Sequence, residues 1–192
     1  MESHEEIRIG DQIWMMKNLN VEHFRNGDHI IHAGLPKAWV SFGESGKTCW
    51  CHYDNLPENG LRYGKLYNWF TVIDPRGLAP LGWHVPSKEE WTRLVEFLGG
   101  EGRAGVRMKN TSGWGRELDG YNGTNESGLA ALPGGYRRTT AEFIEAGQNG
   151  YWWSATEWAG KAWDLSVHAF GNYVFQDTLY KAHGFSVRCV KD

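Results

Sequence analysis

The sequence predicts an α+β fold, with two helices in the first half of the chain and short strands mostly in the second. Three observations support this class. A capping box followed by apolar residues at helical spacing occupies 87–98, and residues 184–190 alternate as a strand does. The 25 glycines and 6 prolines are spread along all 192 residues without forming a linker. We therefore expect a single domain over residues 1–192.

The composition indicates a core made of large rings. The chain has 11 Trp, 8 Tyr and 8 Phe, and its aliphatic residues form no long run, which favours aromatic packing with many loops. The net charge of −3 gives no reason to expect a nucleic-acid partner. No apolar stretch reaches the roughly 20 residues of a membrane-spanning helix. The first residues, MESHEE, lack the pattern of a signal peptide. We expect neither nucleic-acid binding nor membrane insertion.

The first sixty residues predict a hairpin followed by loops. Two short apolar runs within 7–21 flank Gly10 and Asp11, a turn pair, and Ile13, Trp14 and Met15 are expected in the core. From 23 to 57 the chain is rich in turn residues, which predicts loops with one or two short strands.

Two helices are predicted next. The apolar spacing in 63–73 favours a short helix that is buried on most sides. In the second segment, Ser87 and Glu90 have the spacing of a capping box, and four apolar residues follow at i, i+3, i+4 and i+7 before Gly99 and Gly100. The second segment therefore predicts a helix from about 88 to 98.

The second half of the chain is expected to be loops and strands. Residues 102–128 are polar and glycine-rich, which predicts a long ordered loop, and a turn at 147–150 leads into the closing strands. Residues 151–156 and 184–190 resemble framework strands at the two ends of 150–192. Between them, 158–183 mixes aromatic and polar residues without a sustained period, which is typical of a recognition surface.

Four stretches of the chain carry a resemblance to a known family. They read YGKLYNWFTVIDPRGLAPLGWHVPSKEEW at 63–91, LAALPGGYR at 129–137, GYWWSATE at 150–157 and GFSVRCVKD at 184–192. In this order they resemble the Fibrobacter succinogenes major paralogous domain, which is abundant in Bacteroidetes. That family is similar to the formylglycine-generating sulfatase-modifying enzymes. The resemblance implies a C-type-lectin-like fold, with the termini close together, and a cell-surface or extracellular location.

The resemblance also implies a way to diversify the C-terminal segment. Domains of this kind serve as variable proteins of diversity-generating retroelements, in which adenine positions near the end of the gene are randomised. Changing only the adenines of an AAC codon cannot give Trp, Lys or Gln, so Trp163, Gln176 and Lys181 would belong to the framework. Most other residues of the segment, including Ala182, are reachable by this route.

We predict a non-enzymatic domain that binds a protein or glycan ligand through 158–183. The predicted ligand contacts are Trp158, Asp164, Val167, His168, Phe170, Asn172, Tyr173, Phe175, Asp177, Tyr180 and His183. Trp152, Trp153 and Trp163 are interpreted instead as core or rim supports. The alternatives are an enzyme related to the sulfatase-modifying group and a cell-surface structural domain without a variable segment.

No motif predicts a catalytic residue, a cofactor or a metal. The sulfatase-modifying enzymes use a pair of cysteines near the C-terminal end of the domain, whereas this chain has only Cys189 there. Cys49, Cys51 and His52 lack the second ligand pair of a structural zinc site. The calcium-binding triplets of sugar-binding C-type lectins are absent, and Asp164 after Trp163 is expected to be an outward residue of a strand.

Overall fold

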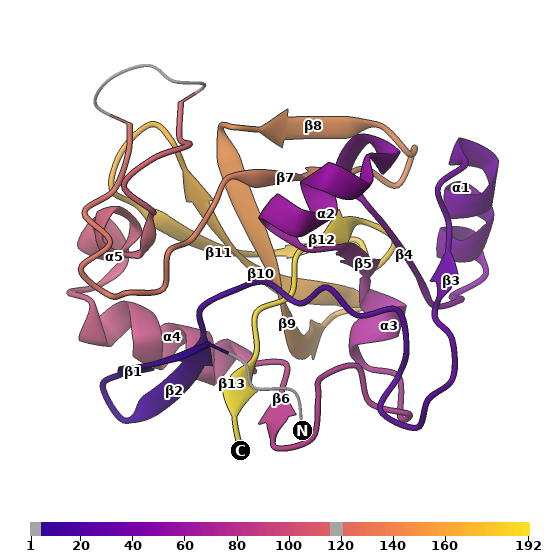
Figure 1. Ribbon diagram of the computed structural model, residues 1–192, viewed down its shortest axis with the longest axis horizontal. Helices are drawn as coiled ribbons and strands as arrows, with labels where there is room; N and C mark the ends of the chain where they lie inside the picture. The colour runs from indigo at the N-terminus through magenta and orange to yellow at the C-terminus, as the bar shows by residue number, and fades with distance from the viewer. Residues whose placement is uncertain (1–4, 116–120) are drawn as a thin grey trace.

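The computed structural model describes residues 5–115 and 121–192 (Figure 1). The helices are α1 (Pro36–Glu44), the 3₁₀ helix η1 (Tyr53–Asn55), α2 (Pro57–Tyr63), α3 (Trp69–Val72), α4 (Lys88–Phe97) and α5 (Glu101–Met108). The strands are β1 (Glu6–Ile9), β2 (Gln12–Met15), β3 (Ile31–His32), β4 (Cys49–Cys51), β5 (Leu66–Asn68), β6 (Trp83–His84), β7 (Gly134–Arg137), β8 (Phe143–Ala146), β9 (Asn149–Trp158), β10 (Lys161–His168), β11 (Val174–Leu179), β12 (Gly184–Phe185) and β13 (Val190–Lys191). This mixture confirms the predicted α+β class.

The strands form two sheets. The small sheet has the order β1-β2-β13-β6, and the large sheet has the order β11-β10-β9-β7-β12-β5-β4-β3, with β8 paired to β7. Most neighbours are antiparallel, but β3 runs parallel to β4 and β7 runs parallel to β9. The small sheet joins the two ends of the described chain, because β1 and β13 both flank β2 and Lys191 Nζ lies 2.8 Å from Glu6 Oε2.

Helix α4 and the first hairpin confirm the sequence predictions. Ser87 Oγ accepts a hydrogen bond from the Glu90 backbone N–H, and the Ser87 backbone N–H donates to Glu90 Oε2 at 2.8 Å, so the capping box is complete. Beyond the helix, Gly99 and Gly100 both have positive φ, which favours glycine. Strands β1 and β2 pair around Gly10, and Trp14 is fully buried.

The prediction of a helix over 63–73 was wrong for the first half of that segment. Leu66–Asn68 forms β5 instead, and only Trp69–Val72 is helical. Tyr67 pairs with Trp50 of β4 on one side and with Phe185 of β12 on the other. Pairing on both sides buries the whole of β5, and this tertiary environment overrides the local apolar spacing.

Two α-helices lie in segments that were predicted to be mostly loops. Helix α1 begins at Pro36, a favourable residue for the first turn, and buries Trp39. Helix α5 overlaps the start of 102–128 although Gly102 and Gly105 lower its helix propensity, because Ala104 and Met108 pack into the core. Residues 116–120 of that predicted loop lie outside the described residues.

The C-terminal stretch 184–190 is two short strands rather than one continuous strand. Strand β12 belongs to the large sheet and β13 to the small sheet, so the stretch crosses from one sheet to the other. On the way, Ser186 O accepts from the Trp153 backbone N–H, and Val187 O accepts from that of Leu19. Every residue of 184–190 is buried, which explains why its side chains do not alternate between core and solvent.

Candidate ligand-binding surface

The strands β9, β10 and β11 have a core face packed against helix α4 and an opposite face that is partly covered by the core cluster of Phe185. On the core face, Leu165, Val167 and Val174 pack with Trp91 and Leu94 of helix α4. The cross-strand pairs Ser166–Tyr151 and Ser166–Phe175 place these three residues together on the opposite face. This second face carries the aromatic and polar side chains discussed below.

Seven rings form a continuous band across this second face of the large sheet, from β11 through β10, β9 and β7 to the turn at 180–183. We call this band the aromatic belt; its members are Tyr173, Phe175, His168, Tyr151, Tyr136, His183 and Tyr180. Neighbouring ring centroids along it are separated by 6.3, 4.7, 6.1, 4.7, 5.6 and 6.3 Å in that order. Each separation falls within the range of interacting aromatic pairs.

The exposed aromatic side chains of the described residues are concentrated in the segment 158–180. Phe97 on helix α4 is the exception, and the other five are Trp158, Phe170, Tyr173, Phe175 and Tyr180, each between 46% and 65% exposed. Trp158 lies at the turn between β9 and β10. Phe170 lies in the loop between β10 and β11, and its ring centroid is 4.7 Å from that of Tyr121. Tyr173, Phe175 and Tyr180 belong to the belt, whereas Trp158 and Phe170 lie at opposite ends of the β9–β10 hairpin. Exposed aromatic residues are a usual feature of recognition surfaces.

The loop 169–173 is fixed to helix α5. Lys109 Nζ is buried and donates to the backbone oxygens of Tyr121 at 3.0 Å, Ala169 at 3.2 Å and Gly171 at 3.0 Å. Burial lowers the pKa of Lys109. The Gly105 backbone N–H donates to Asn172 O at 2.9 Å. These hydrogen bonds hold the loop that carries Phe170 and Tyr173 in one conformation. The two side chains are therefore in place before a ligand binds.

The turn 180–183 is supported from below in a similar way. Lys181 Nζ pairs with Glu157 at 2.8 Å and lies over the Trp69 ring, while Lys181 O accepts from the Trp69 backbone N–H. Helix α1 approaches this turn so closely that a side chain at Gly43 would collide with Ala182. Tyr180 therefore projects from a turn that the core holds in place.

Two predicted contacts do not reach the surface. Val167 is fully buried on the core face, and Asp164 is only 3% exposed. Trp163 is half-buried and lies under Lys88 Nζ at 4.1 Å, so the expected orientation of Trp163 inward and Asp164 outward is reversed. The register of β9 against β10 shifts between Ala162 and Asp164, and this bulge changes which side chains face the core.

The remaining predicted contacts are accessible. Asn172 and Asp177 are exposed with the five aromatic residues, and His168 and His183 are half-buried. Burial lowers the pKa of both imidazoles, that of His183 to about 4, so both rings are neutral at pH 7. Five of the predicted contacts thus belong to the belt, namely His168, Tyr173, Phe175, Tyr180 and His183.

Acidic groups lie next to the belt. Glu145 Oε2 accepts hydrogen bonds from the Tyr151 hydroxyl at 2.6 Å and from Asn149 Nδ2 at 2.8 Å. The pKa of Tyr151 is raised by burial and by this carboxylate. Burial and the nearby Asp177 raise the pKa of Asp164 to about 7, and Asp164 Oδ1 receives no hydrogen bond from the described residues.

Sequence reasoning missed Tyr136 and Tyr151 as members of the surface. Tyr151 lies in a stretch of β9 that was interpreted as framework. Tyr136 lies in β7, and β8 comes between these two strands in the chain. Strand β7 joins the belt because it lies between β9 and β12 in the sheet. No local pattern in the sequence indicates that strand order.

Cys49, Cys51 and Cys189 are all free and buried, and burial raises the pKa of Cys51 and of Cys189 to about 12. Within 5–115 and 121–192, no group of three or more His, Cys, Asp or Glu side chains is arranged to hold a metal ion. In the same residues, no helix has the length and apolar character to cross a bilayer.

Comparison with known proteins identifies the family. The model of the Fibrobacter succinogenes major domain matches residues 7–191. The chain belongs to this family. The four sequence stretches predicted this family, and the matched residues include the whole aromatic belt. Comparisons with curated proteins and with solved structures give no match.

Proposed function

We propose that this Fibrobacter succinogenes major domain is a non-enzymatic binding domain that recognises a protein or glycan through the aromatic belt and its exposed margins. The observation that supports the proposal best is the location of the exposed rings, since Trp158, Phe170 and Tyr173 and two further aromatics all lie within 158–180. The rings supply contact area, and Asn172 and Asp177 supply directional hydrogen bonds.

The proposal includes a C-type-lectin-like fold and diversification of 158–183 by a retroelement. It is supported by a division of the segment, in which buried residues such as Leu165 and Val174 form the framework while exposed residues such as Tyr173 make the contacts. The genome tests the retroelement: a near-copy of the last coding stretch, differing at adenines, should lie beside a reverse-transcriptase gene. If the gene has no such copy nearby, the retroelement is ruled out and binding stands alone.

The alternative of a sulfatase-modifying type of enzyme is less well supported. That chemistry needs reactive thiolates, whereas the three buried thiols have raised pKa values and are protonated at neutral pH. A purely structural domain on the cell surface would leave the exposed rings without a partner.

Replacing Tyr173, Phe175 and Tyr180 together by alanine should abolish ligand binding and leave Tm nearly unchanged. These side chains are 57%, 46% and 63% exposed, so their removal deletes little core packing. Binding is measured by fluorescence on a glycan microarray and by enrichment from a displayed peptide library, which cover both partner classes. Tm is measured by circular dichroism.

A second variant controls for the loss of exposed apolar surface. Leu81→Ala with Phe97→Ala removes side chains that are 78% and 62% exposed outside the proposed surface. This variant should keep every glycan or peptide hit of the unchanged protein. The proposal fails if the triple variant retains those hits, or if the unchanged protein binds nothing in either set.

A further inference from the structure

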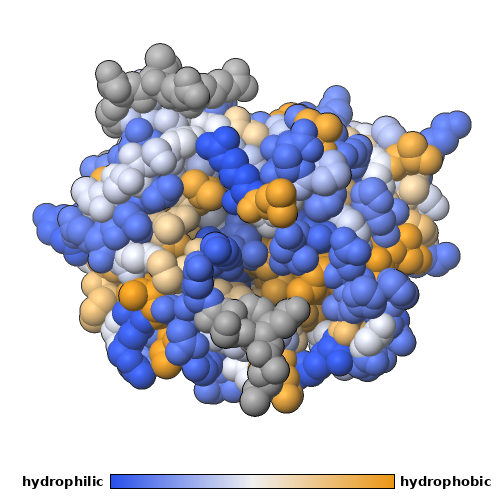
Figure 2. All heavy atoms as spheres, in the orientation of Figure 1, coloured by the Kyte–Doolittle hydropathy of each residue, from blue (hydrophilic) through white to orange (hydrophobic). Residues whose placement is uncertain are grey.

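A cavity of about 290 Å³ lies apart from the aromatic belt. It is enclosed by residues that follow β2, by the C-terminal half of helix α2 and by the loops near Asn110 and Leu132, with Arg188 also in its wall. Figure 2 shows a hollow near the middle of this face, bordered by both hydrophilic and hydrophobic atoms. Its volume is close to the lower end, about 300 Å³, of small-molecule sites.

Arg188 brings a buried positive charge to this cavity. The side chain is 2% exposed; Nε donates to Asn18 Oδ1 at 2.9 Å, and Nη1 donates to Met15 O at 3.0 Å and Leu129 O at 2.7 Å. Among the described residues, Nη2 has no hydrogen-bond acceptor. It is also not one of the unbonded polar atoms that are fully shielded from solvent, so a ligand can reach it. The Nη2 group is therefore free to donate to a ligand in the cavity that Arg188 lines.

The charge of Arg188 has no carboxylate to balance it among the described residues. The neighbouring Cys189 does not balance it, because its raised pKa of about 12 keeps the thiol neutral at pH 7. Burial lowers the pKa of Arg188 to about 9, but the group stays protonated at neutral pH. A buried cation without a counter-ion is unfavourable, and an anionic ligand would relieve this cost.

The charge at the rim of the cavity is also positive. Arg62 and Lys17 are exposed and line the cavity, and among the described residues of the lining the one acidic side chain is Glu5, which pairs with Lys17 at 3.1 Å. Arg62 forms no ion pair with any described residue, and its guanidinium lies over the Tyr63 ring. Among the described residues, three cations therefore face one carboxylate, and their field concentrates anions at the entrance.

We propose that this cavity binds a small molecule through an oxyanion group, a carboxylate or a phosphate. The Nη2 group of Arg188 donates to the oxyanion at the floor, and Arg62 supplies a second positive charge at the rim. The apolar side chains of Met16 and Leu132 contact the remainder of the ligand. This site is independent of the belt, so either proposal can fail while the other stands.

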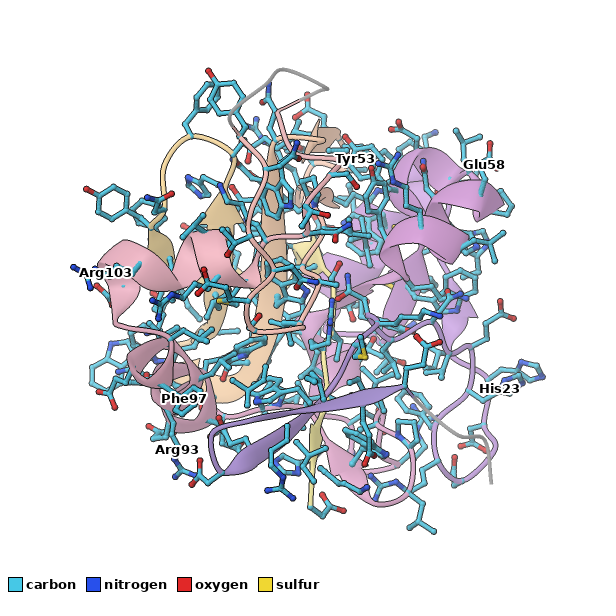
Figure 3. The ribbon with its side chains drawn as sticks, turned by 60° about the vertical axis from the view of Figure 1, so that its left-hand side comes forward. His23, Tyr53, Glu58, Arg93, Phe97 and Arg103 are labelled. Carbon is cyan, nitrogen blue, oxygen red and sulfur yellow. The ribbon has the colours of Figure 1, made fainter. Side chains whose placement is uncertain are left out.

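The experiment compares three single variants of the full chain with the unchanged protein. Arg62→Gln should weaken binding about three- to fivefold, because it removes one exposed charge at the rim. Glu5→Gln should strengthen binding by removing the competing carboxylate. Arg103→Gln, an equal loss of charge on helix α5 outside the cavity lining, should leave affinity unchanged (Figure 3). Affinity is measured by calorimetry with inorganic phosphate and with succinate, at constant ionic strength set by chloride.

Nuclear magnetic resonance gives a direct reading at the floor of the cavity. The Nε–H signal of Arg188 should shift on titration with phosphate, with succinate or with both, and the anion that shifts it identifies the oxyanion class. The proposal is overturned if neither anion moves this signal, or if Arg62→Gln and Arg103→Gln change the affinity equally.

Discussion

Replacing Gly105 by alanine should destabilise the protein by about 2–4 kcal/mol. An added Cβ would lie 2.5 Å from Asn172 O and 2.7 Å from Tyr173 O, and both are backbone atoms that cannot rotate away. The loop 171–173 would have to move off helix α5, which would break the hydrogen bond from the Gly105 backbone N–H to Asn172 O. Urea unfolding measures the loss.

The same helix provides a matched control. A Cβ at Gly102 would meet only Tyr173 Cε1, at 4.0 Å, which is an ordinary contact. Gly102→Ala should therefore stabilise the protein by about 0.5–1 kcal/mol, because alanine is the better helix former. The two substitutions add the same methyl group three residues apart, with opposite expected signs. Equal unfolding free energies for the two variants would show that the loop does not rest on the helix.

The parts of the fold that sequence predicted are those set by local chemistry. Helix α4 has a capping box at its start and glycines with positive φ beyond its end, and these signals act within a few residues. The β1–β2 hairpin depends on a turn at Gly10. Both could be recognised without knowing what packs against them.

The errors occurred where distant residues decide the local structure. Strand β5 is a strand because β4 and β12 pair with it, and β12 comes more than a hundred residues later in the chain. Helix α5 has glycine at position 105 because the loop at 172–173 packs against it there. Neither pairing nor close approach leaves a period in the sequence.

The candidate surface was predicted in outline but not in detail. The exposed rings of Tyr173, Phe175 and Tyr180 lie in the expected segment. Val167 and Asp164 were misplaced because β10 is buried on both faces from Asp164 to Val167, so its residues do not alternate. Tyr136 could not be found because it joins the belt through the order of the strands.

We propose that a fixed framework carries interchangeable contacts, and a pair of displayed libraries tests this division of the domain. The first library randomises the exposed positions Trp158, Phe170, Asn172, Tyr173, Phe175, Asp177 and Tyr180. The second randomises the same number of buried positions, namely Trp152, Trp153, Asp164, Leu165, Val167, Phe185 and Val187. Protease resistance on the yeast surface measures the fraction of folded clones, and selection on lysozyme then measures whether folded clones bind a protein.

We predict that most clones of the first library resist protease as the unchanged domain does, and that binders to lysozyme emerge from them. Clones of the second library should be degraded, because substitutions in a close-packed interior leave cavities or buried polar groups. If the first library is degraded to the same extent as the second, the exposed residues are part of the fold, and the claim of an interchangeable binding surface is contradicted.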